Sequence, residues 1–283
     1  ILHDFTKLIN KFKIERTGFA SVLMLGFDHI GGINTLLGSL IYPKGIAISV
    51  SKKDPETICK LIQNSKAELL PTTPTFLNML IISKFYKKFD LSSLKIITFG
   101  AEFMPKNLFL KLKKIFNKVR LKQTYGLSEF GIMRSKDKNE KSLSIKVGGE
   151  DYKTKIINNF LFVKSKTNMV GYLNYKQPFK NGWLNTGDKV IKSKNGYLRI
   201  LGRESDIINI GGEKVFPQEI EEVLKRLKNV TDARVYSKRH DLFGEYIVAD
   251  LIIDGKISLF PEDKIKSHCK KYLAKYKIPS KFK

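Results

Sequence analysis

The stretch that decides the fold runs from residue 182 to residue 222 and reads GWLNTGDKVIKSKNGYLRILGRESDIINIGGEKVFPQEIEE. Its first seven residues end at Asp188 and predict a turn that carries a carboxylate. Asn195-Gly196, flanked by alternating apolar residues, predicts a tight β-hairpin. Gly202-Arg203 then precedes a polar cluster, a β-branched run and the pair Gly211-Gly212.

The two turns offer complementary chemistry. A carboxylate at Asp188 accepts hydrogen bonds, and a guanidinium at Arg203 donates them. Presented by neighbouring turns, the two groups would suit a vicinal diol such as a ribose. Each turn taken alone is better explained as the solvent-exposed end of a hairpin.

Length and composition set the class of protein. A chain of 283 residues with 42% hydrophobic and 28% charged residues is typical of a globular protein with a sizeable core, and its length predicts two domains. The longest apolar run, residues 19–27, is too short to span a bilayer, and no signal peptide opens the chain. Cys59 and Cys269 lie outside any CxxC spacing, which predicts neither a disulfide nor a metal site and favours a cytoplasmic location.

The formal net charge of +25 raises the question of a nucleic-acid or anionic-membrane partner. Only 8 of the 52 basic residues are arginine, and the lysines are scattered along the chain. No arginine-rich arm, aromatic RNA-binding motif or zinc finger accompanies them. We therefore interpret the charge as lysine on solvated faces and expect no specific nucleic-acid partner and no transmembrane segment.

The first 135 residues alternate between strand and helix patterns after an opening helix predicted over 1–18. Such alternation predicts a parallel sheet covered by helices on both faces. The predicted strands are 20–25, 45–50, 67–72, 95–99 and 120–124, and the helices between them are 34–40, 54–64, 74–82 and 105–117. Because ligands bind at the carboxyl ends of parallel strands, the loops 26–32, 100–102 and 125–129 are expected to share one crevice.

The pattern changes after residue 140. Period-two strands at 153–157 and 160–164 flank Asn158-Asn159, a two-residue hairpin turn, and a further strand is predicted at 197–201. Beyond Arg203 a compact α+β unit follows. The predicted fold class is therefore α/β: a parallel sheet with flanking helices plus a small antiparallel β subdomain, followed by a small α+β carboxyl-terminal domain. The predicted boundaries are 1–201 for the large domain, with subdomains 1–135 and 140–201, and 202–283 for the small one.

Four motifs follow one another in a recognisable order: GFDHIGG at 26–32, YGLSE at 125–129, WLNTGD at 183–188 and GRESDIINIGGEKVFPQEIE at 202–221. Together they resemble the AMP-forming adenylate-forming superfamily, which includes acyl- and aryl-CoA synthetases, the adenylation domains of peptide synthetases and firefly luciferase. The resemblance covers essentially the whole chain. The last motif is specific on its own, whereas the others are specific as a series.

The resemblance implies a nucleotide site. Tyr125, followed by Gly126, would stack on the adenine. Asp188 and Arg203 would hold the ribose hydroxyls. The loop that would line the adenine and acyl pocket consists of Gly100, Ala101 and Glu102.

The resemblance also implies residues for catalysis and for domain movement. Ser128 stands where the family usually has Thr, and its hydroxyl would contact the α-phosphate. Glu129 matches the magnesium-coordinating Glu. His29 matches a position at the mouth of the carboxylate pocket, where a packed wall histidine is the alternative. Ser205 occupies the hinge position, and Gly211-Gly212 would line the channel for the thiol.

The implied activity is the ATP-dependent conversion of a carboxylic acid into an acyl-adenylate, followed by transfer to the thiol of coenzyme A. ATP or AMP, Mg²⁺ and coenzyme A are the expected ligands. Asp28 keeps open an enzyme that activates an amino acid or loads a carrier protein. A basic, non-enzymatic module that binds nucleotides or nucleic acid is a second alternative.

Two parts of the family pattern are not found between residues 1 and 283. The phosphate-binding loop that ends in Lys would precede Ile1, and the catalytic lysine would follow the Lys277–Pro279 segment beyond Lys283. We therefore expect a carboxyl-terminal fragment of a longer synthetase, with impaired catalysis on its own.

Overall fold

The structure is a computed structural model that describes residues 1–10, 12, 17–138, 142–240, 244–253 and 261–283. Two compact units divide the chain. Unit 1 comprises residues 1–104, 108–186 and 191–199, and unit 2 comprises residues 105–107, 187–190 and 200–283.

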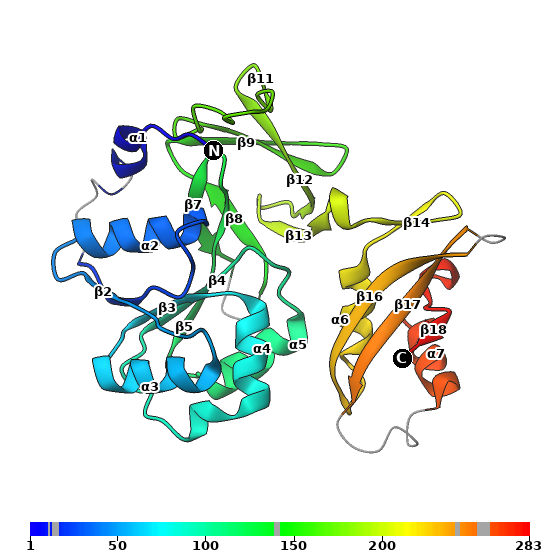
Figure 1. Cartoon of the computed structure of the whole chain (residues 1–283). Helices are drawn as coiled ribbons and strands as arrows, with labels where there is room; N and C mark the ends of the chain where they lie inside the picture. Colours follow the sequence, from blue (N-terminus) through cyan, green and yellow to red (C-terminus); the bar gives the residue numbers. More distant parts are fainter. Residues whose placement is uncertain (11, 13–16, 139–141, 241–243, 254–260) are drawn as a thin grey trace. The chain divides into compact units, whose positions relative to one another are not determined.

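Unit 1 contains a five-stranded sheet in which every neighbouring pair is parallel, which confirms the predicted α/β class (Figure 1). The strands lie in the order β2-β1-β3-β4-β5. Their bounds are β1 Ala20–Val22, β2 Ile46–Ile48, β3 Leu69–Thr72, β4 Ile96–Phe99 and β5 Arg120–Gln123.

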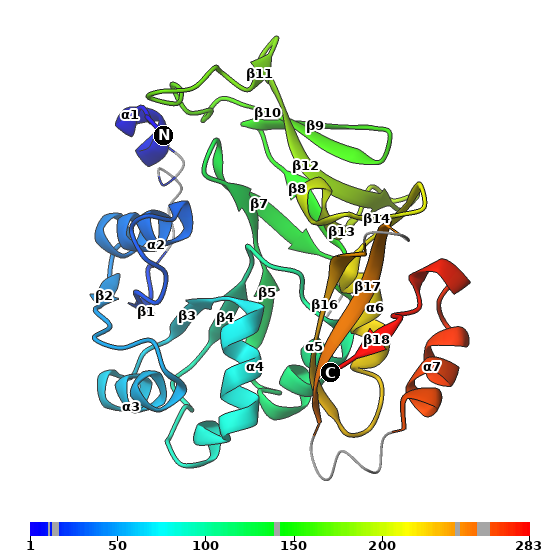
Figure 2. The same cartoon turned by 45° about the vertical axis from the view of Figure 1, so that its right-hand side comes forward.

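Four helices connect these strands: α2 Ile30–Ile41, α3 Pro55–Ser65, α4 Pro74–Ser83 and α5 Lys106–Ile115. The predicted start of α3 is confirmed, because the Asp54 carboxylate accepts the backbone N–H of Thr57 at 3.0 Å and Pro55 occupies the first turn. Helices α3, α4 and α5 share one apolar core with the sheet, whereas α2 packs beside β1, β2 and β7 (Figure 2).

The handedness of the connections explains this division of the helices. The chain steps from β1 to β2 in one direction along the sheet and makes its three later crossovers in the other. Right-handed crossovers then put α2 on the opposite face from α3, α4 and α5. The core between sheet and helices is closely packed, with Leu70, Leu77 and Ile97 fully buried.

The predicted antiparallel β subdomain is a second sheet, in the order β6-β7-β8-β13-β12-β10-β9 with β11 beside β12. Its strands are β6 Tyr125–Leu127, β7 Gly131–Asp137, β8 Ile145–Gly148, β9 Tyr152–Ile157, β10 Phe160–Ser165, β11 Phe179–Lys180, β12 Trp183–Lys192 and β13 Leu198–Arg203. The Asn158-Asn159 turn is confirmed, since both residues have left-handed φ angles of 50° and 65°.

Two local predictions in this sheet are wrong. Asp188 lies within strand β12 rather than in a turn; the turn is at Asn181-Gly182, where both φ angles are positive. Tyr125 opens strand β6, so the predicted loop 125–129 begins as the first arm of a hairpin with β7.

The opening helix is also shorter than predicted. Helix α1 spans Phe5–Asn10, and residues 11 and 13–16 lie outside the described residues. Leu2 instead forms an isolated β-bridge with Gly171, in which the Leu2 N–H donates to the Gly171 carbonyl at 2.7 Å. The segment before Phe5 is therefore extended and held by a distant part of the chain.

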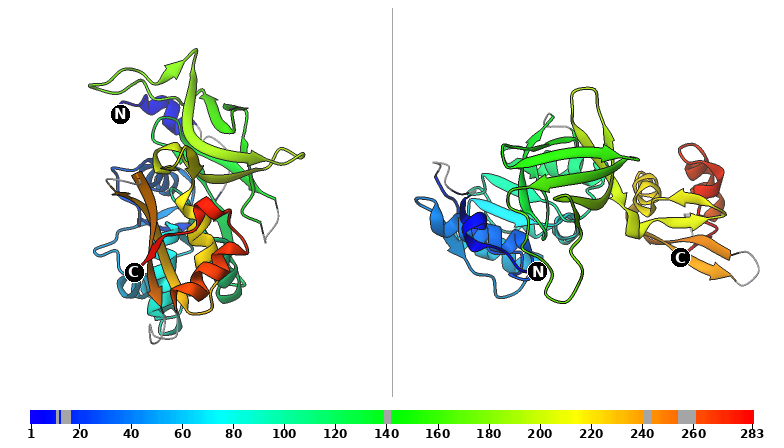
Figure 3. Two further views of the ribbon diagram at one scale, coloured as in Figure 1. Left: turned by 90° about the vertical axis from the view of Figure 1, so that its right-hand side faces the viewer. Right: turned by 90° about the horizontal axis from the view of Figure 1, so that it is seen from above.

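Unit 2 has the predicted α+β composition. Two helices lie on one side of a three-stranded sheet (Figure 3) and share its core, to which Leu224, Ile247 and Cys269 contribute. The elements are β14 Ile208–Ile210, β15 Glu213–Val215, α6 Pro217–Leu224, β16 Val230–His240, β17 Gly244–Ile253, α7 Glu262–Lys270 and β18 Lys281–Phe282.

Both cysteines are free thiols with fully buried side chains, one in each unit. Burial raises the pKa of the Cys59 thiol to about 12 and that of Cys269 to about 11. Among the helices of the described ranges, none is both long enough and apolar enough to cross a bilayer.

Truncation of a core leucine should test the parallel sheet. Leu70→Ala removes a fully buried side chain from β3 and leaves a cavity, so we expect the free energy of unfolding to fall by about 3 kcal/mol. Leu110→Ala on α5 is the matched control, because Leu110 is 44% exposed. Urea unfolding followed by circular dichroism measures both; equal losses for the two variants would contradict the assigned core.

A half-buried carboxyl in unit 2, that of Glu221, gives a pH-dependent prediction. Burial raises the pKa of Glu221, so the folded state binds that proton more tightly than the unfolded state does. Ionised Glu221 therefore destabilises the fold at neutral pH, and Glu221→Gln should be stabilising there. The gain should shrink as pH falls through the raised pKa, and it should vanish below the ordinary Glu pKa of about 4.3.

Urea unfolding midpoints between pH 4 and pH 8 would measure this gain. The glutamine oxygen can still accept the Val235 N–H, which Glu221 accepts at 2.8 Å. Glu219→Gln on the same helix is the control, since the Glu219 carboxylate accepts from Lys277 at 2.6 Å and its loss should bring no gain. A Glu221→Gln effect that is independent of pH would refute the role of burial.

Candidate functional site

Two predicted site segments lie together at one edge of the parallel sheet. Gly100 follows β4, and Tyr125 follows β5 after Thr124; β4 and β5 are parallel neighbours, so both segments leave the sheet at its carboxyl edge. A Cβ added at Gly100 would lie 2.5 Å from Thr124 Oγ1 and 2.8 Å from its carbonyl oxygen. Only glycine leaves room for this close approach.

The neighbouring residues of the first segment have structural contacts of their own. Ala101 adopts a left-handed φ of 66°. The Glu102 carboxylate accepts the backbone N–H of Thr75 at 2.9 Å and the Thr75 hydroxyl at 2.6 Å, within the first turn of α4. Glu102 therefore ties this loop to the helix that follows β3, and its part in an adenine pocket stays a prediction.

The second segment begins in strand. Tyr125 is only 7% exposed and pairs with Met133 across the β6–β7 hairpin. A Cβ at Gly126 would lie 2.4 Å from the Gly131 carbonyl oxygen, so the close pairing of this hairpin excludes any side chain there. The hairpin thus explains this glycine without reference to a ligand.

The turn between β6 and β7, residues 128–130, is held by three consecutive carbonyl groups; we call it the Glu129 turn. The first carbonyl lies 2.6 Å from the His3 Nε2 atom, and the second accepts the Met169 N–H at 2.6 Å. The third accepts the Thr167 hydroxyl at 2.7 Å. Donors from two distant parts of the sequence therefore fix this turn.

The Glu129 side chain also has a partner. The Tyr172 hydroxyl donates to Glu129 Oε1 at 2.6 Å. Burial, the hydrogen bond to Glu129 and its charge raise the pKa of Tyr172 to about 12, so the hydroxyl keeps its proton at neutral pH. Neither His3 nor Tyr172 was predicted as a site residue, because contacts over 125 and 43 residues leave no local spacing signal.

His29 lies at a different place, at the start of α2. Its ring is 3.6 Å from the Asp28 carboxylate, and both side chains are exposed. Within the described ranges no hydrogen bond or ion pair joins His29 to the Glu129 turn. Its position at the mouth of a substrate pocket stays a prediction.

In unit 2, Asp188 and Arg203 are in contact. The Arg203 Nε atom is 3.3 Å from Asp188 Oδ1. The Asp188 side chain is 6% exposed and the Arg203 side chain 50% exposed, so a buried carboxylate faces a guanidinium that water can reach. The sequence predicted that both groups hold a ribose from neighbouring turns; their ion pair was not predicted, and the ribose role stays a prediction.

The remaining predicted residues also lie in unit 2. Ser205 is part of a short 3₁₀ turn, and its hydroxyl donates to Asp206 Oδ1 at 3.0 Å. Gly211 and Gly212 join β14 to β15 with φ angles of 57° and 89°. Because an added Cβ at either glycine would meet open space, the left-handed backbone and not crowding requires glycine here.

Among the described residues, no three His, Cys, Asp or Glu side chains gather into a metal-binding group. Mg²⁺ that arrives with a nucleotide needs only one or two carboxylates, because phosphates and water complete its coordination. Glu129 could serve as one such carboxylate. The described residues do not form a site in which protein side chains alone surround a metal ion.

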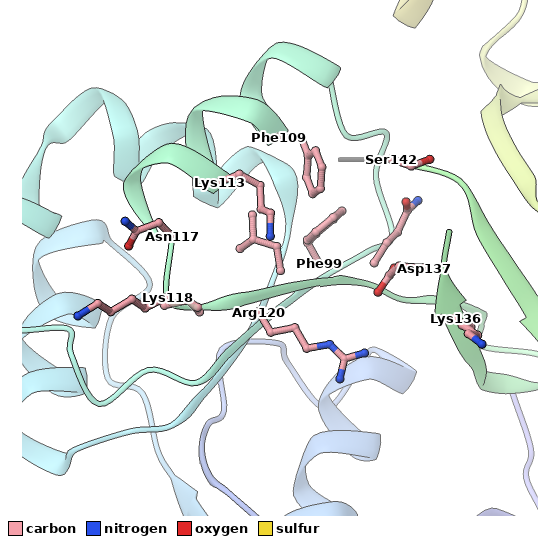
Figure 4. Close-up of a pocket in the computed structure, with 12 residues that line it drawn as sticks. Phe99, Phe109, Lys113, Asn117, Lys118, Arg120, Lys136, Asp137 and Ser142 are labelled. Atoms are coloured by element: carbon pink, nitrogen blue, oxygen red, sulfur yellow. The ribbon is translucent and has the colours of Figure 1, made fainter. Parts of the chain in front are cut away.

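A separate pocket of about 460 Å³ lies beside α5, β5 and β7 (Figure 4). Phe99 and Phe109 contribute apolar surface, and Lys113 and Arg120 contribute positive charge. Asp137 also lines the pocket, and burial raises the pKa of its carboxyl despite nearby cations. None of the predicted site residues is among its lining residues, so this pocket and the candidate site are distinct.

Comparison with known proteins bears directly on these motifs. The family model described as AMP-binding enzyme matches residues 4–159, which is more than half of the 283 residues. The model described as AMP-binding enzyme C-terminal domain matches residues 219–283. The two matches follow the order of the predicted large and small domains.

The curated relatives include 2-succinylbenzoate–CoA ligases. The enzyme of Bacillus pumilus is 29% identical over 92% of this chain and 56% of its own length. The enzyme of Oceanobacillus iheyensis is 28% identical over 91% of this chain and 56% of its own. The chain thus spans little more than half the length of these relatives.

Solved structures share the fold. The amide bond synthetase McbA from Marinactinospora thermotolerans superposes with a TM-score of 0.84 at 18% identity, over 99% of this chain and 61% of that one. The o-succinylbenzoate-CoA synthetase of Bacillus subtilis, in complex with its acyl-adenylate, gives 0.76 at 24% identity, over 98% and 60%. On the family match, the chain belongs to the AMP-binding enzymes, the adenylate-forming superfamily that its motifs resemble.

Proposed function

We propose that this chain is part of an AMP-forming ligase that activates a carboxylic acid with ATP and passes the acyl group to the thiol of coenzyme A. The observation that carries the proposal is the packing of Gly100 against Thr124, which joins loop 100–102 to segment 125–129 at the carboxyl edge of the sheet. In a member of the AMP-binding family, this edge is where a nucleotide is expected. The names of the curated relatives, which are CoA ligases, support the thiol acceptor.

The reaction has two steps. A carboxylate oxygen of the acid attacks the α-phosphorus of ATP and pyrophosphate leaves; the thiol sulfur then attacks the acyl carbon, AMP leaves, and the thiol proton is released to water. Neither step needs a protein nucleophile, so the protein contributes positioning and charge stabilisation. Glu129 would hold the Mg²⁺ that accompanies ATP, and that ion would neutralise charge on the phosphates. Ser128 would offer its hydroxyl to the α-phosphate.

Further roles follow the same proposal. Tyr125 and Gly126, with loop 100–102, would form the adenine site, and the Asp188–Arg203 pair would hold the ribose. His29 would stand at the entrance for the acid. Ser205 would be the hinge of the small domain 202–283, and the Gly211-Gly212 turn would line the thiol channel.

The acid is proposed to lack an amino group, which disfavours an amino-acid-activating enzyme. The Asp28 carboxylate turns back toward its own loop, where its Oδ1 would lie 2.2 Å from a Cβ added at Gly26. Its Oδ2 also lies 3.6 Å from the His29 ring, so both carboxylate oxygens face groups of the same loop. Fatty and aryl acids both fit this proposal. The two buried free thiols support a cytoplasmic location.

The role of Glu129 can be tested by calorimetry. We expect the chain to bind ATP more tightly with Mg²⁺ than without it, and Glu129→Gln to weaken MgATP binding about tenfold while metal-free AMP binding is unchanged. Glu150→Gln, at an exposed carboxylate of unit 1, is the control. A chain that binds neither ATP nor AMP, but binds nucleic acid in a salt-sensitive manner, would favour the basic binding module instead.

The role of Asp188 has a separate test. Asp188→Asn keeps the shape of the side chain but removes its charge, and hydrogen bonds to a charged group contribute about 1.5–3 kcal/mol. We therefore expect AMP affinity to fall at least tenfold, whereas affinity for inorganic pyrophosphate should not change. Glu245→Gln, at an exposed carboxylate of unit 2, controls for net charge. Unchanged AMP affinity in Asp188→Asn would remove this residue from the ribose site.

A further inference from the structure

Tyr172 lies on the segment between β10 and β11, 43 residues from Glu129 in the sequence. Its hydroxyl donates to Glu129 Oε1 at 2.6 Å, a short hydrogen bond of the kind formed with a carboxylate. The ring is half-buried, so part of this bond is shielded from water.

The backbone around Tyr172 is held in place by other hydrogen bonds. The Met169 N–H donates to the Glu129 carbonyl, and the Val170 N–H donates to the Leu2 carbonyl at 2.8 Å. The Gly171 carbonyl in turn accepts the Leu2 N–H. The backbone of the three residues before Tyr172 is therefore hydrogen-bonded to other parts of the chain. These bonds restrict the position of the Tyr172 backbone and so of the base of its side chain.

The acceptor is fixed in the same way. All three carbonyls of the Glu129 turn are hydrogen-bonded, one of them to Met169 of the Tyr172 segment. The donor and the acceptor of the Tyr172–Glu129 hydrogen bond are therefore both attached to backbone that other hydrogen bonds hold in place. The bond then restricts the remaining freedom, which is the rotation of the Glu129 side chain.

The donor to Glu129 Oε1 is a phenol and not a cationic side chain. A phenol is uncharged, so it can donate a hydrogen bond to Oε1 without cancelling the charge of the carboxylate. A lysine or arginine there would compete with a cation; among the described residues, no ion pair involves Glu129. With Oε1 held by the phenol, the directions open to Oε2 are restricted as well.

From these contacts we infer that Tyr172 is a positioning residue that orients Glu129, through its Oε1 atom, so that Oε2 is presented to the Mg²⁺ of the bound nucleotide. The inference rests on the proposed function, in which Glu129 is a magnesium ligand. Partners that orient a metal ligand typically change metal affinity 10–100-fold when they are removed.

The test is Tyr172→Phe, which removes one hydroxyl and keeps the ring. Mn²⁺ serves as the probe, and its binding in the presence of a non-hydrolysable ATP analogue is followed by electron paramagnetic resonance. We expect about tenfold weaker Mn²⁺ binding in Tyr172→Phe, with metal-free AMP affinity unchanged. Tyr175→Phe is the matched control, because Tyr175 lies on the same segment and is 81% exposed.

A double variant separates action through Glu129 from direct contact with the metal. In a Glu129→Gln background, Tyr172→Phe should cause no further loss of Mn²⁺ affinity. Parent-like Mn²⁺ binding by Tyr172→Phe, or equal losses of Mn²⁺ and metal-free AMP affinity, would overturn the inference alone. A parent chain that binds no Mn²⁺ with the nucleotide would overturn the proposed function and this inference with it.

Discussion

The parallel pairing of β3 with β4 is the constraint on which unit 1 depends. Its register places Leu70 opposite Ile97, and both side chains are fully buried in the core that α3, α4 and α5 share. With β5 added in parallel, the carboxyl ends of these strands come to one edge. The position of the candidate nucleotide site is thus a consequence of apolar packing, and the loops at that edge need only carry suitable polar groups.

A second kind of constraint acts on the Glu129 turn. Packing against a sheet can place a loop to within a few ångströms, but it does not orient a carboxylate. Here hydrogen bonds from His3, Thr167, Met169 and Tyr172 supply the orientation. Two segments with little regular structure of their own therefore determine how precisely one acidic side chain is presented.

The sequence predicted those features that are encoded locally. Alternating apolar patterns indicated the strands and helices of both units, and Asn158-Asn159 indicated its turn. It placed Asp188 wrongly, because glycine and polar neighbours in strand β12 have the composition of a turn. It could not predict the contact of Tyr172 with Glu129, since no periodicity relates residues that only the folded chain brings together. The ligand-binding roles of the site residues stay predictions.

The burial of Cys59 and Cys269 has a practical consequence for spectroscopy. Thiol-reactive labels are attacked by the thiolate, and both side chains are inaccessible and hold their protons at neutral pH. A cysteine introduced on the surface of either unit can therefore be labelled selectively without removal of the native ones. Fluorophores or spin labels attached in this way, one on each unit, would report whether the distance between the two labels changes when ATP, a carboxylic acid or a thiol is added.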